Sequence, residues 1–347
     1  MKQYKSLDLA KFICAILIVI IHTSPFGSYS KVLSFGFRNI ICVIAVPFFF
    51  LTSGFLAFKK IDRLDSDKKK EYVFNYLKRL AIMYFIWSAI YFIFVVIKWT
   101  RGTFSIYSVL EYIKDFFFEG SYSTIWFLPA LFVATLAVYL LHKKFSYKTI
   151  FVISCAVYVF TLLGSSYYGL ATKVPFLNVI YSIYYSFFDS IKNGICFGMI
   201  FVCMGAMLSE EDEKNTKPVS ALKAFIPVAL CAMLLAAEEF LVAYFKWNVR
   251  GVDTVISLIP FTYFFFKFVM SLDINISDRT AIAMRKYSIL MFLCQRIPLS
   301  IIDLFLADTI VATNSILYFA VVLTTTLLIS FVIIQLSKKY KIIKYAY

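Results

Sequence analysis

Long apolar stretches recur along the chain and are separated by short polar segments. A membrane-spanning helix needs about 20 mostly apolar residues, and about ten stretches approach this length. They lie at residues 9–26, 40–58, 77–98, 124–141, 149–164, 191–208, 222–245, 254–271, 286–306 and 315–337. The tyrosine-rich run from Tyr181 to Phe188 predicts a separate interfacial helix before the sixth span, because tyrosine favours the headgroup level. The pattern predicts an all-α, polytopic membrane protein with about ten transmembrane helices around a polar cavity.

Composition and charge agree with this class. Hydrophobic residues make up 61% of the chain and charged residues 16%, which is typical of a membrane protein. We expect residues 1–347 to form a single transmembrane domain. Lysine and arginine gather in alternate loops, most densely from Lys59 to Arg79, and this predicts that both termini are cytoplasmic and that the protein lies in the cell membrane.

The same distribution bears on partners. The net charge of +15 is accounted for by the cytoplasmic loops and anionic lipid, so it indicates the bilayer and no nucleic acid as partner. A homo-oligomer stays open, because lipid-facing and helix-facing surfaces are both apolar. The 7 cysteines lie within predicted spans without zinc-ligand spacing, and the chain has 2 histidines, so we expect no metal site.

His22 is the polar residue that stands out within the first span. It follows Lys11 by eleven residues, which places the two side chains within roughly 20° on one helix face and about 16 Å apart along the axis. An ionisable residue inside the membrane indicates a functional site. The alternative is a polar residue near a helix end that is hydrogen-bonded to a neighbour.

A few other polar residues fall within or beside the spans. Asp189 and Lys192 have a spacing that allows a pair within one helix. Glu239 and the glutamate before it point about 100° apart, so at most one of them fully faces a cavity. Arg296 in the ninth span needs a partner, and Asp303 is the nearest carboxylate in sequence. A structural ion pair or a solvated surface pair explains these residues equally well.

Several motifs occur in a fixed order along the chain. They are a basic residue followed after ten positions by histidine (Lys11 to His22), Pro47-Phe-Phe-Phe ending in Ser53-Gly54, the basic pair Lys78-Arg79 at the third span, and Trp126-Phe-Leu at the fourth. In this order they resemble the acyltransferase 3 family of integral-membrane acyltransferases over the whole chain. The resemblance implies a catalytic role for His22 and acyl-CoA as co-substrate, without a permanently bound cofactor.

The sequence departs from that family at three positions. Lysine occupies position 11, where arginine is usual, and Lys11 lacks the planar fork that suits phosphate. Tyr76 stands where many relatives have the first of two arginines, and Gln295 stands where the family pattern has a histidine. The first two changes bear on binding of the acyl donor, and the third bears on contacts to the acceptor.

A second resemblance concerns part of the chain. Residues 47–54, 125–131 and above all 189–208, beginning Asp189-Ser-Ile-Lys192-Asn193-Gly194, look like the membrane half of the vancomycin-resistance membrane-bound serine racemases. In those proteins this half is implicated in supplying L-serine to a racemase domain. The chain is then a free-standing relative or the membrane half of a larger protein.

Two functions follow from these resemblances. In the first, the protein moves an acyl group, with acetyl expected, from cytoplasmic acyl-CoA to a hydroxyl of a surface glycan or its lipid-linked precursor. His22 is then the general base or a transient acyl carrier. The residues expected at coenzyme A phosphates are Lys11, Lys78 and Arg79, and those expected at the acceptor or thioester are Trp126 and Arg296.

In the second, the protein transports or binds a small zwitterion such as serine. Its carboxylate needs a cation, supplied by Arg296 or Lys192, and its amine needs a carboxylate, supplied by Asp189 or Glu239.

Overall fold

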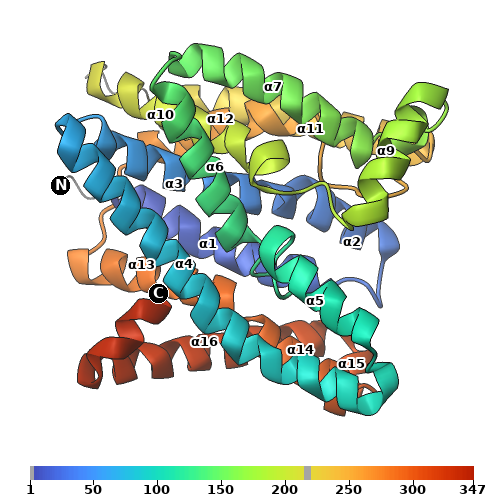
Figure 1. The fold of residues 1–347 in the computed structure, drawn as a ribbon. Coiled ribbons are helices and arrows are strands. Elements are labelled where there is room, and N and C mark those ends of the chain that lie inside the picture. The colour runs from blue at the N-terminus through green and yellow to red at the C-terminus, as the bar shows by residue number, and fades with distance from the viewer. Residues whose placement is uncertain (1–3, 215–219) are drawn as a thin grey trace. The chain divides into compact units, whose positions relative to one another are not determined.

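The computed structural model describes residues 4–214 and 220–347, and this part of the chain consists of helices and loops (Figure 1). Its 8 helical segments long and apolar enough to cross a membrane are Lys5–Thr23, Lys31–Ile61, Ser66–Gly102, Tyr147–Gly164, Gly194–Glu213, Ala221–Tyr244, Asp278–Phe305 and Ser315–Lys339. Phe127–His142 and Leu258–Ser271 are shorter and also apolar. Each predicted span falls on one of these helices, which confirms the all-α polytopic class. The number of crossings, the polar cavity and the placement of the termini stay predictions.

The individual elements subdivide some of these segments. In chain order they are α1 (Lys5–Thr23), α2 (Lys31–Gly36), the π-helix η1 (Phe37–Ile41), the 3₁₀-helix η2 (Cys42–Ile44), α3 (Ala45–Ile61), α4 (Ser66–Lys98), the π-helix η3 (Trp99–Thr103), α5 (Ile106–Phe118), α6 (Phe127–His142), α7 (Tyr147–Gly164), α8 (Tyr168–Ala171), α9 (Pro175–Phe187), the π-helix η4 (Gly194–Gly198), α10 (Met199–Lys214), α11 (Ala221–Tyr244), α12 (Leu258–Ser271), α13 (Asp278–Cys294), α14 (Arg296–Phe305), α15 (Ile310–Thr313), α16 (Ser315–Lys339) and the 3₁₀-helix η5 (Lys341–Ala346). The tyrosine-rich run lies mostly in α9, a separate helix as expected, whereas α5 was not predicted from the sequence.

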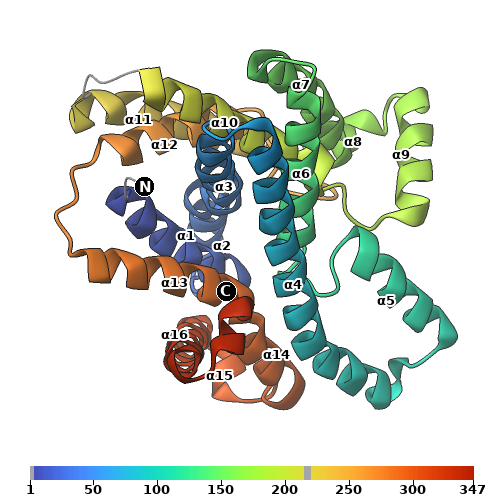
Figure 2. The same ribbon diagram turned by 60° about the vertical axis from the view of Figure 1, so that its left-hand side comes forward.

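The chain divides into two compact units. Unit 1 comprises residues 1–45, 79–128 and 273–347, and unit 2 comprises residues 46–78 and 129–272. Within unit 1, α13 lies alongside α1, and α16 packs against both (Figures 1 and 2). Within unit 2, α11 pairs with α12 and α10 packs against α7. The prediction of a single domain stays a prediction.

Glycine allows close helix packing in unit 2. A Cβ atom added to Gly54 of α3 would lie 2.3 Å from the backbone oxygen of Val202 in α10. One added to Gly205 of α10 would lie 2.1 Å from the backbone oxygen of Leu51 in α3. The two backbones therefore approach so closely that neither position accepts a side chain, as is common where membrane helices cross. The Ser-Gly end of the second motif thus has a packing role.

Candidate functional site

Helices α1 and α13 run parallel in unit 1, and side-chain contacts fix their register. The Lys5 ammonium lies 2.9 Å from a carboxylate oxygen of Asp278, near the start of both helices. Two turns further along, the rings of Phe12 and Tyr287 meet edge to face with centroids 6.5 Å apart. This register places the C-terminal end of α1 near the C-terminal end of α13.

A buried carboxylate links the first motif to α13. Asp8 accepts two hydrogen bonds from Arg285, at 2.9 Å from Nε and 2.7 Å from Nη2. Lys11 lies 3.5 Å from the same carboxylate, and its side chain is 10% exposed. Lys11 is therefore held inside the protein by Asp8, and it does not form an open cationic rim. Arg285, which was not predicted as a site residue from the sequence, has a side chain that is 45% exposed.

His22 lies in the last turn of α1, close to the end of the helix. Ser24 adopts a left-handed conformation with φ 45° and caps the helix, and Pro25 follows, so α1 ends at Thr23 and not at residue 26 as predicted. The His22 side chain is half-buried. Among residues 4–214 and 220–347 no hydrogen bond to its ring is present, so the hydrogen-bonded alternative is not what the structure contains. Its ring nitrogens can therefore accept or donate a proton.

Arg296 is brought to the same end of unit 1 by a break in the ninth span. Pro298 lacks a backbone N–H and its ring clashes with the carbonyl four residues earlier, which is that of Cys294. Helix α13 ends at this residue, and α14 begins at Arg296. His22 lies within electrostatic range of Arg296 and of Arg38 from η1. Two arginines thus contribute positive charge near the imidazole.

The predicted pair between Arg296 and Asp303 is wrong for the described part of the chain. Asp303 accepts a hydrogen bond of 3.1 Å from the Tyr318 hydroxyl, and no ion pair joins it to Arg296. The buried Nε atom of Arg296 makes no hydrogen bond within the described residues. Both residues lie on α14, so the helical spacing itself holds, but the Tyr318 hydroxyl of α16 binds Asp303 instead.

Aromatic rings form a wall beside Arg296. The rings of Tyr91 and Tyr122 stack in parallel with centroids 4.7 Å apart. The Arg296 guanidinium lies 5.9 Å from the centroid of Tyr122, and the Lys98 ammonium lies 5.5 Å from the same ring. The Tyr122 hydroxyl is 2.7 Å from the Ser300 hydroxyl. These contacts hold Tyr122 in place and surround it with positive charge.

The other residues predicted to take part in acyl transfer lie in different environments. Lys78 and Arg79 are neighbours on α4 and both are exposed. Trp126 is half-buried in the loop before α6, and a Cβ atom on Gly120, whose φ is +103°, would lie 2.6 Å from its backbone. Gly120 is therefore needed to seat the loop that carries Trp126.

In unit 2 the predicted pair between Asp189 and Lys192 is wrong. Both residues lie in a non-helical segment between α9 and η4. The Lys192 ammonium instead donates to both carboxylate oxygens of Asp253, at 2.6 and 2.7 Å. The helical spacing therefore does not apply, and Lys192 anchors the loop before α12.

The adjacent glutamates of α11 have different environments. Glu238 accepts hydrogen bonds from the backbone N–H groups of Ile256 at 2.7 Å and Ser257 at 2.8 Å, and from the Tyr167 hydroxyl. Glu238 thus satisfies donors at the start of α12, where negative charge is favourable. Glu239 is fully buried in α11.

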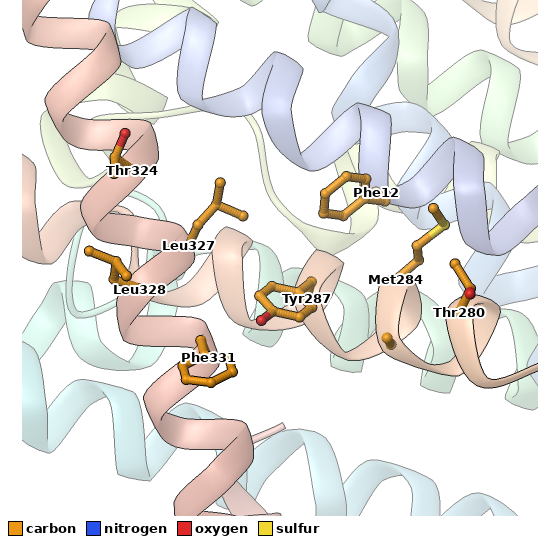
Figure 3. Close-up of a pocket in the computed structure, with 9 residues that line it drawn as sticks. Phe12, Thr280, Met284, Tyr287, Thr324, Leu327, Leu328 and Phe331 are labelled. Carbon is orange, nitrogen blue, oxygen red and sulfur yellow. The ribbon is translucent and has the colours of Figure 1, made fainter.

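An open apolar groove of about 460 Å³ lies on unit 1 (Figure 3). Its lining residues are Phe12, Thr280, Ala283, Met284, Tyr287, Thr324, Leu327, Leu328 and Phe331, from α1, α13 and α16. None of them is charged, so this groove suits apolar chains and offers no acid or base for acyl transfer.

The helical architecture, with 8 helical segments long and apolar enough to cross a membrane among the described residues, is that of an integral-membrane protein. The chain matches the acyltransferase domain family, acyltransferase 3, over residues 4–335, and it belongs to that family. The resemblance seen in the motifs is confirmed.

Curated relatives carry other names. The chain is similar to two amino-acid racemases of Enterococcus faecalis, at 35% identity over 217 residues and 29% over 211, and to a serine/alanine racemase of Enterococcus gallinarum, at 26% over 262. The matches cover 62%, 60% and 75% of this chain, but 29%, 30% and 36% of the relatives. The chain thus spans about a third of the length of these relatives. No solved structure matches it.

Proposed function

We propose that the protein is a membrane O-acyltransferase that moves an acyl group, with acetyl expected, from acyl-CoA to a hydroxyl of a surface glycan or its lipid-linked precursor. The family match over residues 4–335 supports acyl transfer. His22 is assigned as the catalytic residue because its imidazole is half-buried and makes no hydrogen bond within the described chain.

His22 acts as the general base. A hydroxyl is a weak nucleophile until its proton is removed, and a neutral imidazole can take that proton near pH 7. As the proton moves to His22, the hydroxyl oxygen bonds to the thioester carbonyl carbon and a tetrahedral intermediate forms. The bond between carbon and sulfur then breaks, the acyl ester is released, and the proton on His22 passes to the coenzyme A thiolate.

Cations on unit 1 and α4 are suited to the donor's phosphates. Lys78 and Arg79 are exposed and can meet phosphate directly, as bidentate arginine contacts commonly do. Lys11 is buried behind Asp8, so its contribution to the donor is through Asp8 and Arg285. Arg285 supplies a planar guanidinium beside the position where the family usually has arginine.

Binding or transport of a small amino acid is the second candidate. It is favoured by the relatives, which are named as amino-acid and serine/alanine racemases. Among the residues that the sequence analysis assigned to a zwitterion, Lys192 is bound to Asp253 and Glu239 is fully buried. Arg296 remains the better cation for a carboxylate, because its Nε atom is without a hydrogen bond among the described residues.

Two measurements on the purified full chain in nanodiscs separate these functions. Coenzyme A should raise the melting temperature, because a ligand that binds the native state at 100 times its dissociation constant stabilises it by about 2.7 kcal/mol. L-serine at a saturating concentration is the comparison ligand, and its effect on the melting temperature is measured in the same way. A shift with serine and none with coenzyme A, together with serine uptake by proteoliposomes, would refute acyl transfer in favour of transport.

A cell-based assay tests the reaction itself. Surface glycan from cells that produce the wild-type protein should release acetate on alkaline treatment. Glycan from cells that produce His22→Ala at equal level should release none above background. Equal acetate from both would remove His22 from catalysis.

A further inference from the structure

The side chains around His22 carry an excess of positive charge that the proposed reaction does not use. Arg296 and Arg38 both lie within electrostatic range of the imidazole. Asp303, the next carboxylate on α14, accepts a hydrogen bond of 3.1 Å from the Tyr318 hydroxyl. No ion pair holds Arg38 or Arg296 within the part of the chain that the structure describes. A charged group within a membrane segment is expected to be paired or to serve a ligand.

The packing of unit 1 fixes this arrangement independently of charge. Val19, three residues before His22, and Leu299, three residues after Arg296, belong to one buried cluster that also contains Ile302 and Val322. Positions three apart share a helix face, so each of the two functional side chains lies one turn from a member of this cluster. The guanidinium is further restrained against the Tyr122 ring at 5.9 Å.

Arg38 reaches the same end of α1 through a short loop. The ring of Phe26, which follows α1, contacts the ring of Phe37 with centroids 4.9 Å apart, and Phe37 immediately precedes Arg38 in η1. This contact folds η1 back toward the end of α1. Arg38 is exposed, while Arg296 is half-buried.

We infer that the acceptor is anionic: a carboxylate or phosphate on the same molecule as the reacting hydroxyl binds Arg296, with Arg38 at the entrance, and this positions the hydroxyl beside His22. The inference rests on the proposed acyl transfer and names its substrate class. Arginine suits it because its planar fork binds carboxylate or phosphate in a bidentate manner. The Nε atom of Arg296, which lacks a hydrogen bond among the described residues, supplies one prong of that fork.

The test compares acceptors with and without an anionic group. Full-length protein in nanodiscs is given labelled acetyl-CoA and one of three matched pairs: methyl glucuronide and methyl glucoside, glycerol 3-phosphate and glycerol, or L-serine and L-serinamide. We expect the wild type to acetylate the anionic member of at least one pair tenfold or more faster. The pair that shows this effect identifies the source of the anion as a sugar acid, a polyol phosphate or a hydroxy amino acid.

Arg296→Gln tests the residue. It should abolish the preference for the anionic member, measured as the ratio of the two acetylation rates. Arg63→Gln, on an exposed arginine paired with Glu213, is the control and should keep the preference.

Outcomes separate this inference from the proposed function. Acetyl-CoA cleavage with equal rates for charged and neutral acceptors would overturn the anionic acceptor and leave acyl transfer intact. A raised KM for acetyl-CoA in Arg296→Gln, with the acceptor preference kept, would assign Arg296 to the donor and also overturn the inference. Absence of any acetyl-CoA cleavage by the wild type would refute the proposed function itself.

Discussion

Replacing Asp8 by asparagine removes the carboxylate that pairs with both Arg285 and Lys11. The two cations differ in how much they depend on it. The Arg285 side chain is 45% exposed and can turn toward water or headgroups. The Lys11 side chain is 10% exposed, so its charge would remain buried without compensation.

The size of the effect follows from this burial. Removing one partner of a buried ion pair costs about 3–5 kcal/mol, mainly because the other charge is left unpaired. The exposure of Arg285 reduces its share, so we expect Asp8→Asn to lower the free energy of unfolding by about 3 kcal/mol. Lys11→Met should cost less, because Asp8 keeps its two hydrogen bonds to Arg285.

Equilibrium unfolding by SDS in mixed micelles, followed by circular dichroism, measures these differences. Asp278→Asn is the matched control, because its carboxylate pairs with Lys5 at the surface and is 71% exposed, and such pairs contribute about 0–1 kcal/mol. Adding Lys11→Met to Asp8→Asn should recover part of the loss. A loss no larger than that of Asp278→Asn, or a double variant no more stable than Asp8→Asn, would refute the account of this cluster.

Three further predictions concern packing, pH and topology. Gly205→Ala should lower the free energy of unfolding by about 1–3 kcal/mol, because the added methyl group overpacks against α3. Gly36→Ala should be neutral or stabilising, because a Cβ atom there meets nothing within 4 Å. Equal effects of the two variants in the same SDS titration would contradict the packing argument. Burial raises the pKa of Asp62, and a hydrogen bond from Tyr147 only partly opposes this. The stability that the neutral carboxyl contributes is therefore complete below pH 3.8 and is lost as pH rises through the raised pKa. Asp62→Asn should remove that loss, and an unchanged pH profile of unfolding would contradict this prediction. A reporter inserted after Lys68 should be cytoplasmic, and an external signal there would reverse the orientation.

The sequence was sufficient to predict the helices but not their internal breaks. Apolar stretches of membrane length are direct evidence of spans, so all the predicted ones fall on helices. Pro298 interrupts the ninth span, and Pro25 ends the first one early, because proline removes a backbone donor. Both prolines are visible in the sequence and were the available signals. α5 was missed because a helix of 13 residues is too short for the transmembrane criterion.

The site was predictable only in part, because pairing depends on packing between distant segments. The Lys11 to His22 spacing correctly placed both residues on one helix of unit 1. Spacing along the chain suggested Asp189 for Lys192, whereas the structure places Asp253 there. Arg285 could not be selected from the sequence, since only the parallel packing of α1 and α13 brings it to Asp8.

The role of His22 as base is tested most directly by the rate of acetyl-CoA cleavage in purified His22→Ala and His142→Ala proteins. The chain has 2 histidines, and His142 stacks on Tyr147 with ring centroids 3.7 Å apart, in unit 2, so His142→Ala is a matched control. A general base contributes about 10²–10⁴-fold. The account predicts a loss of at least 100-fold for His22→Ala and a rate near wild type for His142→Ala. Cleavage by His22→Ala within a few-fold of wild type would contradict it.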